Sequence, residues 1–389
     1  MSCVACLCSR SYVIFKYWHC MKTTIAPKAS CNCLRLAILA AALALPCQLS
    51  RGQDGAEAAG EEMSLEKSNV HWTFSAQWEN DLWVDTDRNY TNGAKLSWVS
   101  PDLTEYRDAG TLPGIIYRIS DFIPFIHAPH TQRNVAINIG QNMYTPADIS
   151  VPDPDPLDRP YAGWLYFGVG FHNMTERWLD IVELNIGVTG SWSMAEETQK
   201  FVHKHIRGNI IPQGWDHQIG REVVVNLVGE RKVRFWRLGE ERGHAADAFV
   251  HFGGSLGTLY TFANAGFTVR TGWNLPSDFG SSPIRIAGDV NAPAASDDPR
   301  LEGGAGWGIH FFGSMDQRAV LFDATLDGNL FGDDVSVDKK PFVTDLSFGV
   351  SLVVWNWKLS CAQVARSREY RTQKDDWHRF GSFSLSYTY

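Results

Sequence analysis

From residue 70 to the C-terminus, segments of about ten residues alternate apolar with small or polar side chains, and turn residues separate the segments. The first segment shows the pattern clearly, with Trp72, Phe74 and Trp78 on one face and Ser75 and Glu79 on the other. Because successive side chains of a strand point to opposite sides, this segment predicts a strand with one apolar and one polar face. The pattern is typical of an all-β fold, a transmembrane antiparallel β-barrel that is apolar toward lipid and polar toward its lumen.

About twelve such segments can be counted, plus or minus two, and bacterial barrels have an even number of strands. The longest segment, 304–325, has the length to contain a hairpin, which would raise the count. No run after residue 51 is apolar over the ~20 residues that a transmembrane helix needs. The segments lie at 71–79, 92–100, 133–143, 161–173, 179–190, 222–238, 246–258, 262–273, 304–325, 342–354, 356–369 and 379–389.

The last segment alternates strictly and ends on an aromatic residue, with Phe383, Leu385, Tyr387 and Tyr389 on one face. A terminal amphipathic strand of this kind resembles the signal that barrel-insertion machinery reads. An ordinary closing strand of a soluble β-protein would look similar, but the upstream segments favour the membrane. Fourteen tryptophans beyond residue 51 agree with this choice, since aromatic residues gather at both interfaces of a membrane.

The first 51 residues have a different composition, with six basic residues, no Asp or Glu, and an apolar run from Leu36 to Leu45. This arrangement predicts a secretory signal peptide, and the run is too short to span a bilayer. Met21 gives a leader of more usual length, so residues 1–20 are expected to be an over-called extension. Pro46 directly before Cys47 argues against a lipoprotein site and favours ordinary cleavage near 47–54. Residues 52–69 are small and polar and predict a disordered lead-in to a barrel at 70–389.

Composition excludes some classes of protein. After cleavage Cys361 is the only cysteine left, so stability cannot come from disulfides and a closed hydrogen-bonded barrel would supply it. The mature chain carries 29 basic and 43 acidic residues, and a net charge of about −14 is wrong for a protein that binds nucleic acid. Such a charge suits a surface that meets lipopolysaccharide through divalent cations, although many secreted proteins are equally acidic.

If the first strand starts on the periplasmic side, the connections 80–91, 144–160 and 191–221 all emerge on the outer face. The first of them is rich in oxygen ligands, the atoms that calcium prefers. Its spacing does not match an EF-hand, and an Asp- and Asn-rich hairpin loop is often simply solvated. The candidate ligands are Asn80, Asp81, Asp85, Asp87 and Thr91.

The third of these connections predicts a short helix over 193–208, with Ser193 as its N-cap, Glu196 three residues later and Gly208 as its stop. Gln199 and His203 follow Glu196 on one face, and a histidine held by such neighbours can act as a general base. An exposed helix histidine without a role is the alternative. Met194, Val202 and Ile206 form a separate apolar stripe.

The hydrolase motifs G-x-S-x-G and H-E-x-x-H are both absent. Other strings resemble the outer-membrane lipid A deacylase family, most densely within 72–220. They are Glu-Asn-Asp at 79–81, Thr-Asp-Arg-Asn-Tyr-Thr-Asn-Gly at 86–93, Gly-Gln-Asn-Met-Tyr-Thr-Pro at 140–146, Asp-Arg-Pro-Tyr-Ala-Gly-Trp at 158–164 and Pro-Gln-Gly-Trp-Asp at 212–216. The resemblance implies a twelve-stranded outer-membrane barrel that removes the 3′ acyloxyacyl group of lipid A in a calcium-dependent hydrolysis at its outer rim.

Carried over residue by residue, the family's catalytic set falls on Asn80, Asp81, Thr91, Gln199 and His203, all of which are present. The resemblance thus implies a mechanism in which His203 takes a proton from a water that attacks the ester. Calcium, held by Asp81 together with Asn80 or nearby carbonyls, would neutralise the oxyanion. Gln199 and Thr91 would orient the reacting groups.

The chain also departs from the family. The connection from Thr145 to Asp158 has no Lys or Arg, and Asn209-Ile210-Ile211 stands where the family's type member has an acidic residue. Phosphate contacts would then come from Arg88, Arg159, Lys200 or Lys204. Two alternatives therefore stay open: a non-catalytic structural or pore-forming barrel, and an esterase or phospholipase acting on another envelope lipid.

Overall fold

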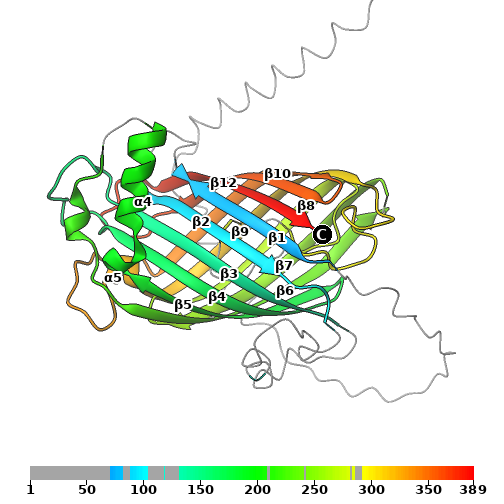
Figure 1. The fold of residues 1–389 in the computed structure, drawn as a ribbon, viewed down its shortest axis with the longest axis horizontal. Helices are drawn as coiled ribbons and strands as arrows, with labels where there is room; N and C mark the ends of the chain where they lie inside the picture. The colour runs from blue at the N-terminus through cyan, green and yellow to red at the C-terminus, as the bar shows by residue number, and fades with distance from the viewer. Residues whose placement is uncertain are drawn as a thin grey trace, which may run out of the picture. The chain divides into compact units, whose positions relative to one another are not determined.

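The computed structural model describes residues 71–389 apart from 82–87, 104–117, 119–130, 208–210, 241, 281–282 and 285–290. Twelve strands form a closed antiparallel barrel in which each strand pairs with its neighbours in the chain and β1 pairs with β12 (Figure 1). The strands are β1 (Thr73–Asn80), β2 (Asn89–Val99), β3 (Gln132–Thr145), β4 (Ala162–Met174), β5 (Trp178–Thr189), β6 (Val223–Gly239), β7 (His244–Gly257), β8 (Tyr260–Trp273), β9 (Trp307–Asp323), β10 (Phe342–Val354), β11 (Trp357–Ser367) and β12 (Trp377–Thr388).

The predicted fold class and strand count are confirmed. The segment 304–325 contains no hairpin: β9 runs unbroken over 17 residues, and the short helix α5 (Ala324–Asp327) follows it. The predicted signal peptide at 1–51 and lead-in at 52–69 lie outside the described residues. Among the described residues, no helix is both long enough and apolar enough to cross a membrane.

The two faces of the wall follow the alternation of the sequence. In β1, Thr73 and Ser75 are buried in the lumen, whereas Trp78 is 44% exposed on the outside. In β12, Ser386 is buried and Leu385 is exposed, as the sequence predicts. Exposed apolar side chains cover the outside of the whole wall, an arrangement that is stable only in an apolar solvent. They include Ile139, Phe167, Ile186, Leu227, Phe252, Phe267, Phe311, Phe348 and Leu359.

The two ends of the barrel differ. One end, which we call the helix end, carries α4 (Ala195–Val202), α5 and the connections β1–β2, β3–β4, β5–β6, β9–β10 and β11–β12 (Figure 1). The opposite end holds the first residue of β1 and the last of β12. A long connection at that end, 274–306 between β8 and β9, places Asp278 and Arg300 in the lumen, where both are fully buried.

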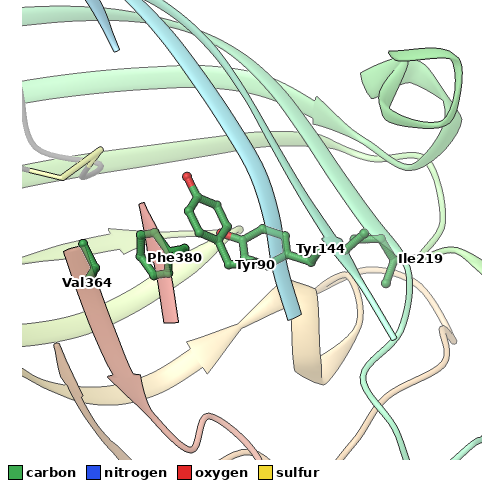
Figure 2. Close-up of a cluster of buried hydrophobic side chains, with 6 residues drawn as sticks. Tyr90, Tyr144, Ile219, Val364 and Phe380 are labelled. Atoms are coloured by element: carbon green, nitrogen blue, oxygen red, sulfur yellow. The ribbon is translucent and has the colours of Figure 1, made fainter. Parts of the chain in front are cut away.

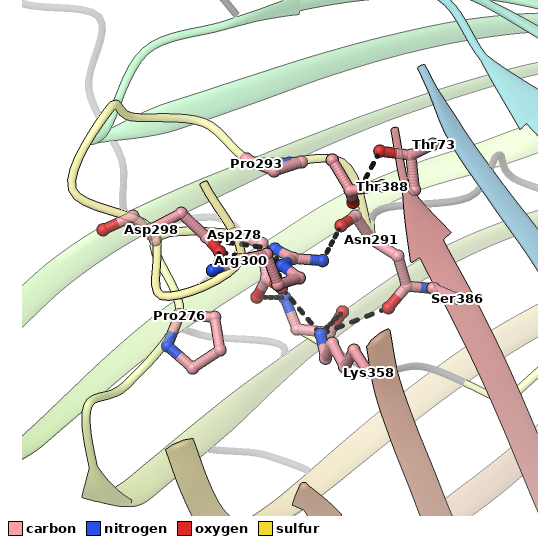
Figure 3. A network of polar contacts seen from close by, with 12 residues as sticks. Thr73, Pro276, Asp278, Asn291, Pro293, Asp298, Arg300, Lys358, Ser386 and Thr388 are labelled. Atoms are coloured by element: carbon pink, nitrogen blue, oxygen red, sulfur yellow. Dashed lines mark hydrogen bonds and ion pairs between the residues drawn. The ribbon is translucent and has the colours of Figure 1, made fainter. Parts of the chain in front are cut away.

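Asp278 is the centre of a buried network of charges (Figure 3). Its carboxylate accepts hydrogen bonds from Arg270 of β8 at 2.6 Å, from Lys358 of β11 at 2.6 Å and from Arg300 at 3.0 Å. Arg270 also pairs with Asp247 of β7 at 2.6 Å. Connection 274–306 is therefore bound to the inner wall on several sides of the lumen.

Nearer the helix end, a cluster of aromatic side chains projects into the lumen (Figure 2). The ring of Tyr90 packs against Phe380 at 4.9 Å and against Tyr144 at 5.3 Å between centroids. The Tyr144 hydroxyl meets that of Tyr260 at 2.8 Å, which joins β3 to β8 across the barrel. Side chains from distant strands thus meet inside this barrel.

Candidate active site on the outer barrel wall

Asn80 and Asp81 stand at the helix end of β1. Because Glu79 points into the lumen, Asn80 lies on the outer face, where its Nδ2 donates to Asn92 Oδ1 of β2 at 3.3 Å. Asp81 is fully buried, and its Oδ2 accepts from the backbone N–H of Arg88 at 2.7 Å. The end of the strand therefore places an amide and a carboxylate in consecutive positions. Asp85 and Asp87, the other predicted ligands of this loop, lie outside the described residues.

Thr91 reaches the same outer face through a β-bulge. The register between β2 and β3 shifts between Tyr90 and Asn92, and Tyr90 turns into the lumen. The Thr91 hydroxyl then lies 2.6 Å from that of Thr145, which shares the outer face of β3 with Met143. An extra residue re-aims neighbouring side chains in this way at a bulge.

Helix α4 begins at Ala195 and ends at Val202, and a π-helical turn from His203 to Arg207 continues it. The predicted N-cap at Ser193 is wrong. Met194 is the N-cap residue, in a left-handed conformation with φ of 56°, and Ser193 Oγ donates to Gly190 O at 2.6 Å instead. Ser193 closes the preceding 3-10 turn, which sets the angle at which α4 starts. The predicted stop at Gly208 lies outside the described residues.

Gly163 of β4 allows the start of α4 to pack closely against the barrel wall. A Cβ at Gly163 of β4 would stand 2.1 Å from Ser193 Oγ and 2.4 Å from Ala195 Cβ, which leaves no room for any larger residue. Gln141 of β3 donates from Nε2 to Ser193 O at 2.7 Å. Both contacts are on the outside, so α4 packs against the outer face of β3 and β4.

The buried face of α4 is polar. Gln199 is 2% exposed and His203 is 3% exposed, one and two turns beyond the buried Ala195. The apolar Met194 and Phe201 are instead 56% and 58% exposed. Glu197, Lys204 and His205 are exposed as well, so the exposed side of the segment is mixed while two polar side chains are buried against the wall.

Helix α4 contacts β3 and β4, and His203 follows its last residue. Ala195 touches β4, and eight residues at 1.5 Å each carry the helix about 12 Å further. Strands lie about 4.8 Å apart, so this distance spans between two and three strands. Figure 1 shows α4 crossing this end of the wall from β3 and β4 in the direction of β1. A helix that continues in this direction would bring the buried His203 toward the strands that carry Thr91 and Asn80.

Gln199 is held by a residue whose role the sequence did not reveal. Trp215 Nε1 donates to Gln199 Oε1 at 2.8 Å, and the buried indole packs on Tyr161 at 4.8 Å between centroids. With Oε1 occupied, Gln199 presents Nε2, a buried donor with no hydrogen-bond partner among the described residues. Trp215 lies in the string at 212–216 that resembles the family, and this string was the only feature of the sequence that pointed to a role for Trp215.

Replacing Trp215 with phenylalanine is expected to lower the activity proposed below about tenfold, because Gln199 loses the bond that fixes its amide. The ring keeps its packing on Tyr161, so the barrel should remain folded. The measurement is kcat/KM in detergent, with Trp192→Phe as the control, since Trp192 is 51% exposed. Equal losses in both variants would contradict this role for Trp215.

The four predicted phosphate contacts have different surroundings. Lys204 is exposed on the helix, and Lys200 pairs with Glu196 at 2.5 Å. Arg88 is partly exposed and pairs with Asp375 at 2.7 Å. Arg159 does not fit the expected role: its guanidinium is fully buried, bonds to Glu369 at 3.2 Å and lies 4.5 Å above the Tyr144 ring. It joins the rim to the inner wall.

Among the described residues, no group of three or more His, Cys, Asp or Glu side chains is arranged to hold a metal ion. The donors that Asn80, Asp81 and Thr91 bring to the end of β1 and β2 are all oxygen atoms. Hard cations such as calcium bind oxygen ligands that include amides, backbone carbonyls and water. The donor set therefore fits calcium better than zinc or copper.

The fold defines a class of protein: a membrane β-barrel, here with a short helix packed on the outer face of its wall. Within this class, the chain belongs to the LpxR family, because the family model described as outer membrane protein LpxR matches residues 36–389. The protein is accordingly located in the outer membrane.

One solved structure supports the fold. LpxR from Salmonella typhimurium matches with a TM-score of 0.64 at 17% identity, covering 81% of this chain and 99% of that one. The β domain of the Bordetella autotransporter BrkA, at 10% identity, covers 83% of this chain and 99% of its own with a TM-score of 0.36, too low to add to the assignment. A search of curated proteins gave no match.

Proposed function

We propose that this protein is an esterase that hydrolyses the 3′-linked acyloxyacyl group of lipid A. One observation carries the proposal: Gln199 and His203 are buried where α4 packs on the outer wall, while the apolar Met194 and Phe201 beside them are exposed. A lipid in the outer leaflet can bring an ester to such a site by lateral diffusion, with its acyl chains still in hydrocarbon. The lumen, where Tyr144 and Tyr260 meet, gives less support to a pore.

His203 acts as the general base. Its neutral imidazole accepts a proton from water as the water oxygen attacks the ester carbonyl. When the tetrahedral species collapses, the imidazolium returns that proton to the departing sugar oxygen, which yields an alcohol and a carboxylic acid. The Nε2 amide of Gln199 and the hydroxyl of Thr91 orient the water and the carbonyl. Because water is the nucleophile, this chemistry needs no activated serine.

Asn80 and Asp81 are the residues that would hold calcium, through the amide oxygen and the carboxylate. A bound calcium ion supplies positive charge to the carbonyl oxygen of the ester. The rigidity of the position comes from the protein: Asn92 fixes the Asn80 amide, and the Arg88 N–H fixes one oxygen of Asp81.

Removal of calcium is expected to abolish acyl release, and its return to restore it. The measurement is mass spectrometry of lipid A incubated with purified protein in calcium, in EDTA, and in EDTA followed by excess calcium. A loss of the 3′ acyloxyacyl mass in the first and third samples alone supports the proposal. The same loss in EDTA would refute the role of the metal, and an unchanged spectrum throughout would refute the substrate and direct the search to glycerophospholipids.

A further inference from the structure

A cleft of about 230 Å³ opens at the helix end of the barrel, apart from the residues of the proposed reaction. Arg88 of the β1–β2 connection lines one side of it, and Asp155 and Leu157 of the β3–β4 connection line another. Gln373 and Lys374 of the β11–β12 connection complete it. The three connections are distant in sequence and meet because closure of the barrel puts β12 beside β1.

Hydrogen bonds between the connections hold the walls of the cleft in place. The Tyr370 hydroxyl donates to Asp158 and lies 3.3 Å from Asn89 Oδ1, which ties β11–β12 to the other two connections. Thr372 Oγ1 donates to Leu157 O at 2.5 Å. A wall that is already fixed binds a ligand without the cost of ordering its loops.

Gln373, which lines the cleft, has a donor without a partner among the described residues. The residue is 3% exposed, and its Oε1 accepts from the backbone N–H of Glu369 at 2.8 Å. Its Nε2 is buried and has no hydrogen-bond partner among the described residues. A buried donor in this state is costly, and a ligand oxygen at the cleft would remove the cost.

The lining suits hydroxyl groups, each of which can both donate and accept. Gln373 and Lys374 carry N–H donors and Asp155 a carboxylate acceptor, while Arg88 and Asp375, which also line the cleft, pair with each other at 2.7 Å. Leu157, which is 64% exposed, offers an apolar surface to the face of a ring. Three carboxylates, including Asp158, stand against two basic groups, and this balance disfavours a phosphate.

The cleft is joined to the proposed reaction site through Arg88. Its side chain lines the cleft, and its backbone N–H holds Asp81 at 2.7 Å. We propose that the cleft binds a sugar residue of the saccharide that extends from lipid A, so that the protein prefers lipopolysaccharide to lipid A alone. The preference rests on the proposed function, whereas binding of the saccharide does not.

The test uses Gln373→Glu, which keeps the acceptor for Glu369 and loses the Nε2 donor, and separately Lys374→Ala. Arg371→Ala, a basic and exposed residue of the same connection, is the control. Titration calorimetry in detergent measures binding of core oligosaccharide released by mild acid, with inorganic phosphate as the second probe. The ratio of kcat/KM on lipopolysaccharide to kcat/KM on lipid A measures preference.

Each cleft variant is expected to bind the oligosaccharide about tenfold more weakly and to lower the kcat/KM ratio about tenfold, with no change in the control. Failure of the wild type to bind the oligosaccharide, equal binding of phosphate, or an unchanged ratio in both folded variants would overturn the proposal. Binding without any hydrolysis would support the sugar cleft and refute the esterase instead.

Discussion

Replacing His203 with alanine is expected to lower deacylation by about two to four orders of magnitude, the usual contribution of a general base. The imidazole is 3% exposed although it belongs to a surface connection, and it lies on the face of α4 that packs against the barrel. Without it, the attacking water has no acceptor for its proton. The measurement is single-turnover acyl release from lipid A in saturating calcium, which separates chemistry from binding.

His205→Ala is the matched control for this variant. His205 lies two residues further on and is exposed, with Nδ1 3.1 Å from Phe201 O, so its loss should change the rate less than twofold. Both variants should show the heat-dependent gel shift of a folded barrel. Near-normal activity of folded His203→Ala would remove the general base from the mechanism, whatever calcium does.

Replacing Asp278 with alanine is expected to destabilise the barrel by about 3–5 kcal/mol, the cost of removing one partner from a buried ion pair. Arg270, Arg300 and Lys358 would then lose their shared carboxylate inside the lumen. The measurement is urea unfolding in detergent. Asp297→Ala is the control, because Asp297 is part-exposed and stands 4.0 Å from Arg237, so its loss should cost less than about 1 kcal/mol. Equal costs in both variants would contradict the importance of the network.

The Asp278 carboxylate also makes the stability of the barrel depend on pH. Burial alone would raise the pKa of Asp278, but the charges of Lys358, Arg300 and Arg270 outweigh it and hold the pKa well below its usual range. A depressed pKa contributes stability above the unfolded value of about 3.9, and this stability is lost as pH falls through the folded value. The difference between wild type and Asp278→Ala should therefore be constant near neutral pH and shrink only below about pH 4.

The strands could be predicted from the sequence because their side chains alternate between polar residues that face the lumen and apolar residues that face lipid. Ser75 and Trp78 are assigned to lumen and lipid by parity alone, and the structure agrees. Connection 274–306 has no such alternating pattern, so its place in the lumen could not be predicted. Asp278 and Arg300 read as ordinary loop charges, and only the closed barrel shows that they meet Lys358, 58 residues beyond Arg300, inside the lumen.

The sequence proposes the members of the candidate site but not their placement. Asn80, Thr91 and His203 follow from motifs, yet the bulge that places Thr91 beside Thr145 and the burial of Gln199 and His203 depend on tertiary contacts. Arg159 shows the limit most clearly. Because Arg159 is the basic residue of a rim motif, the sequence suggested a phosphate contact. In the structure its guanidinium is buried and donates to Glu369, 210 residues later. Single-sequence reasoning cannot supply that pairing.

The pairing of β1 with β12 has a consequence for the life of the protein. Asn80 faces Asn92 on one side and Gly381 on the other, so the strand that carries the proposed ligands is fixed only when the last strand of the chain has joined the first. A chain in transit across the periplasm has none of these pairings. Insertion and assembly of the candidate site are then one event, so the proposed hydrolase would become competent only at its destination.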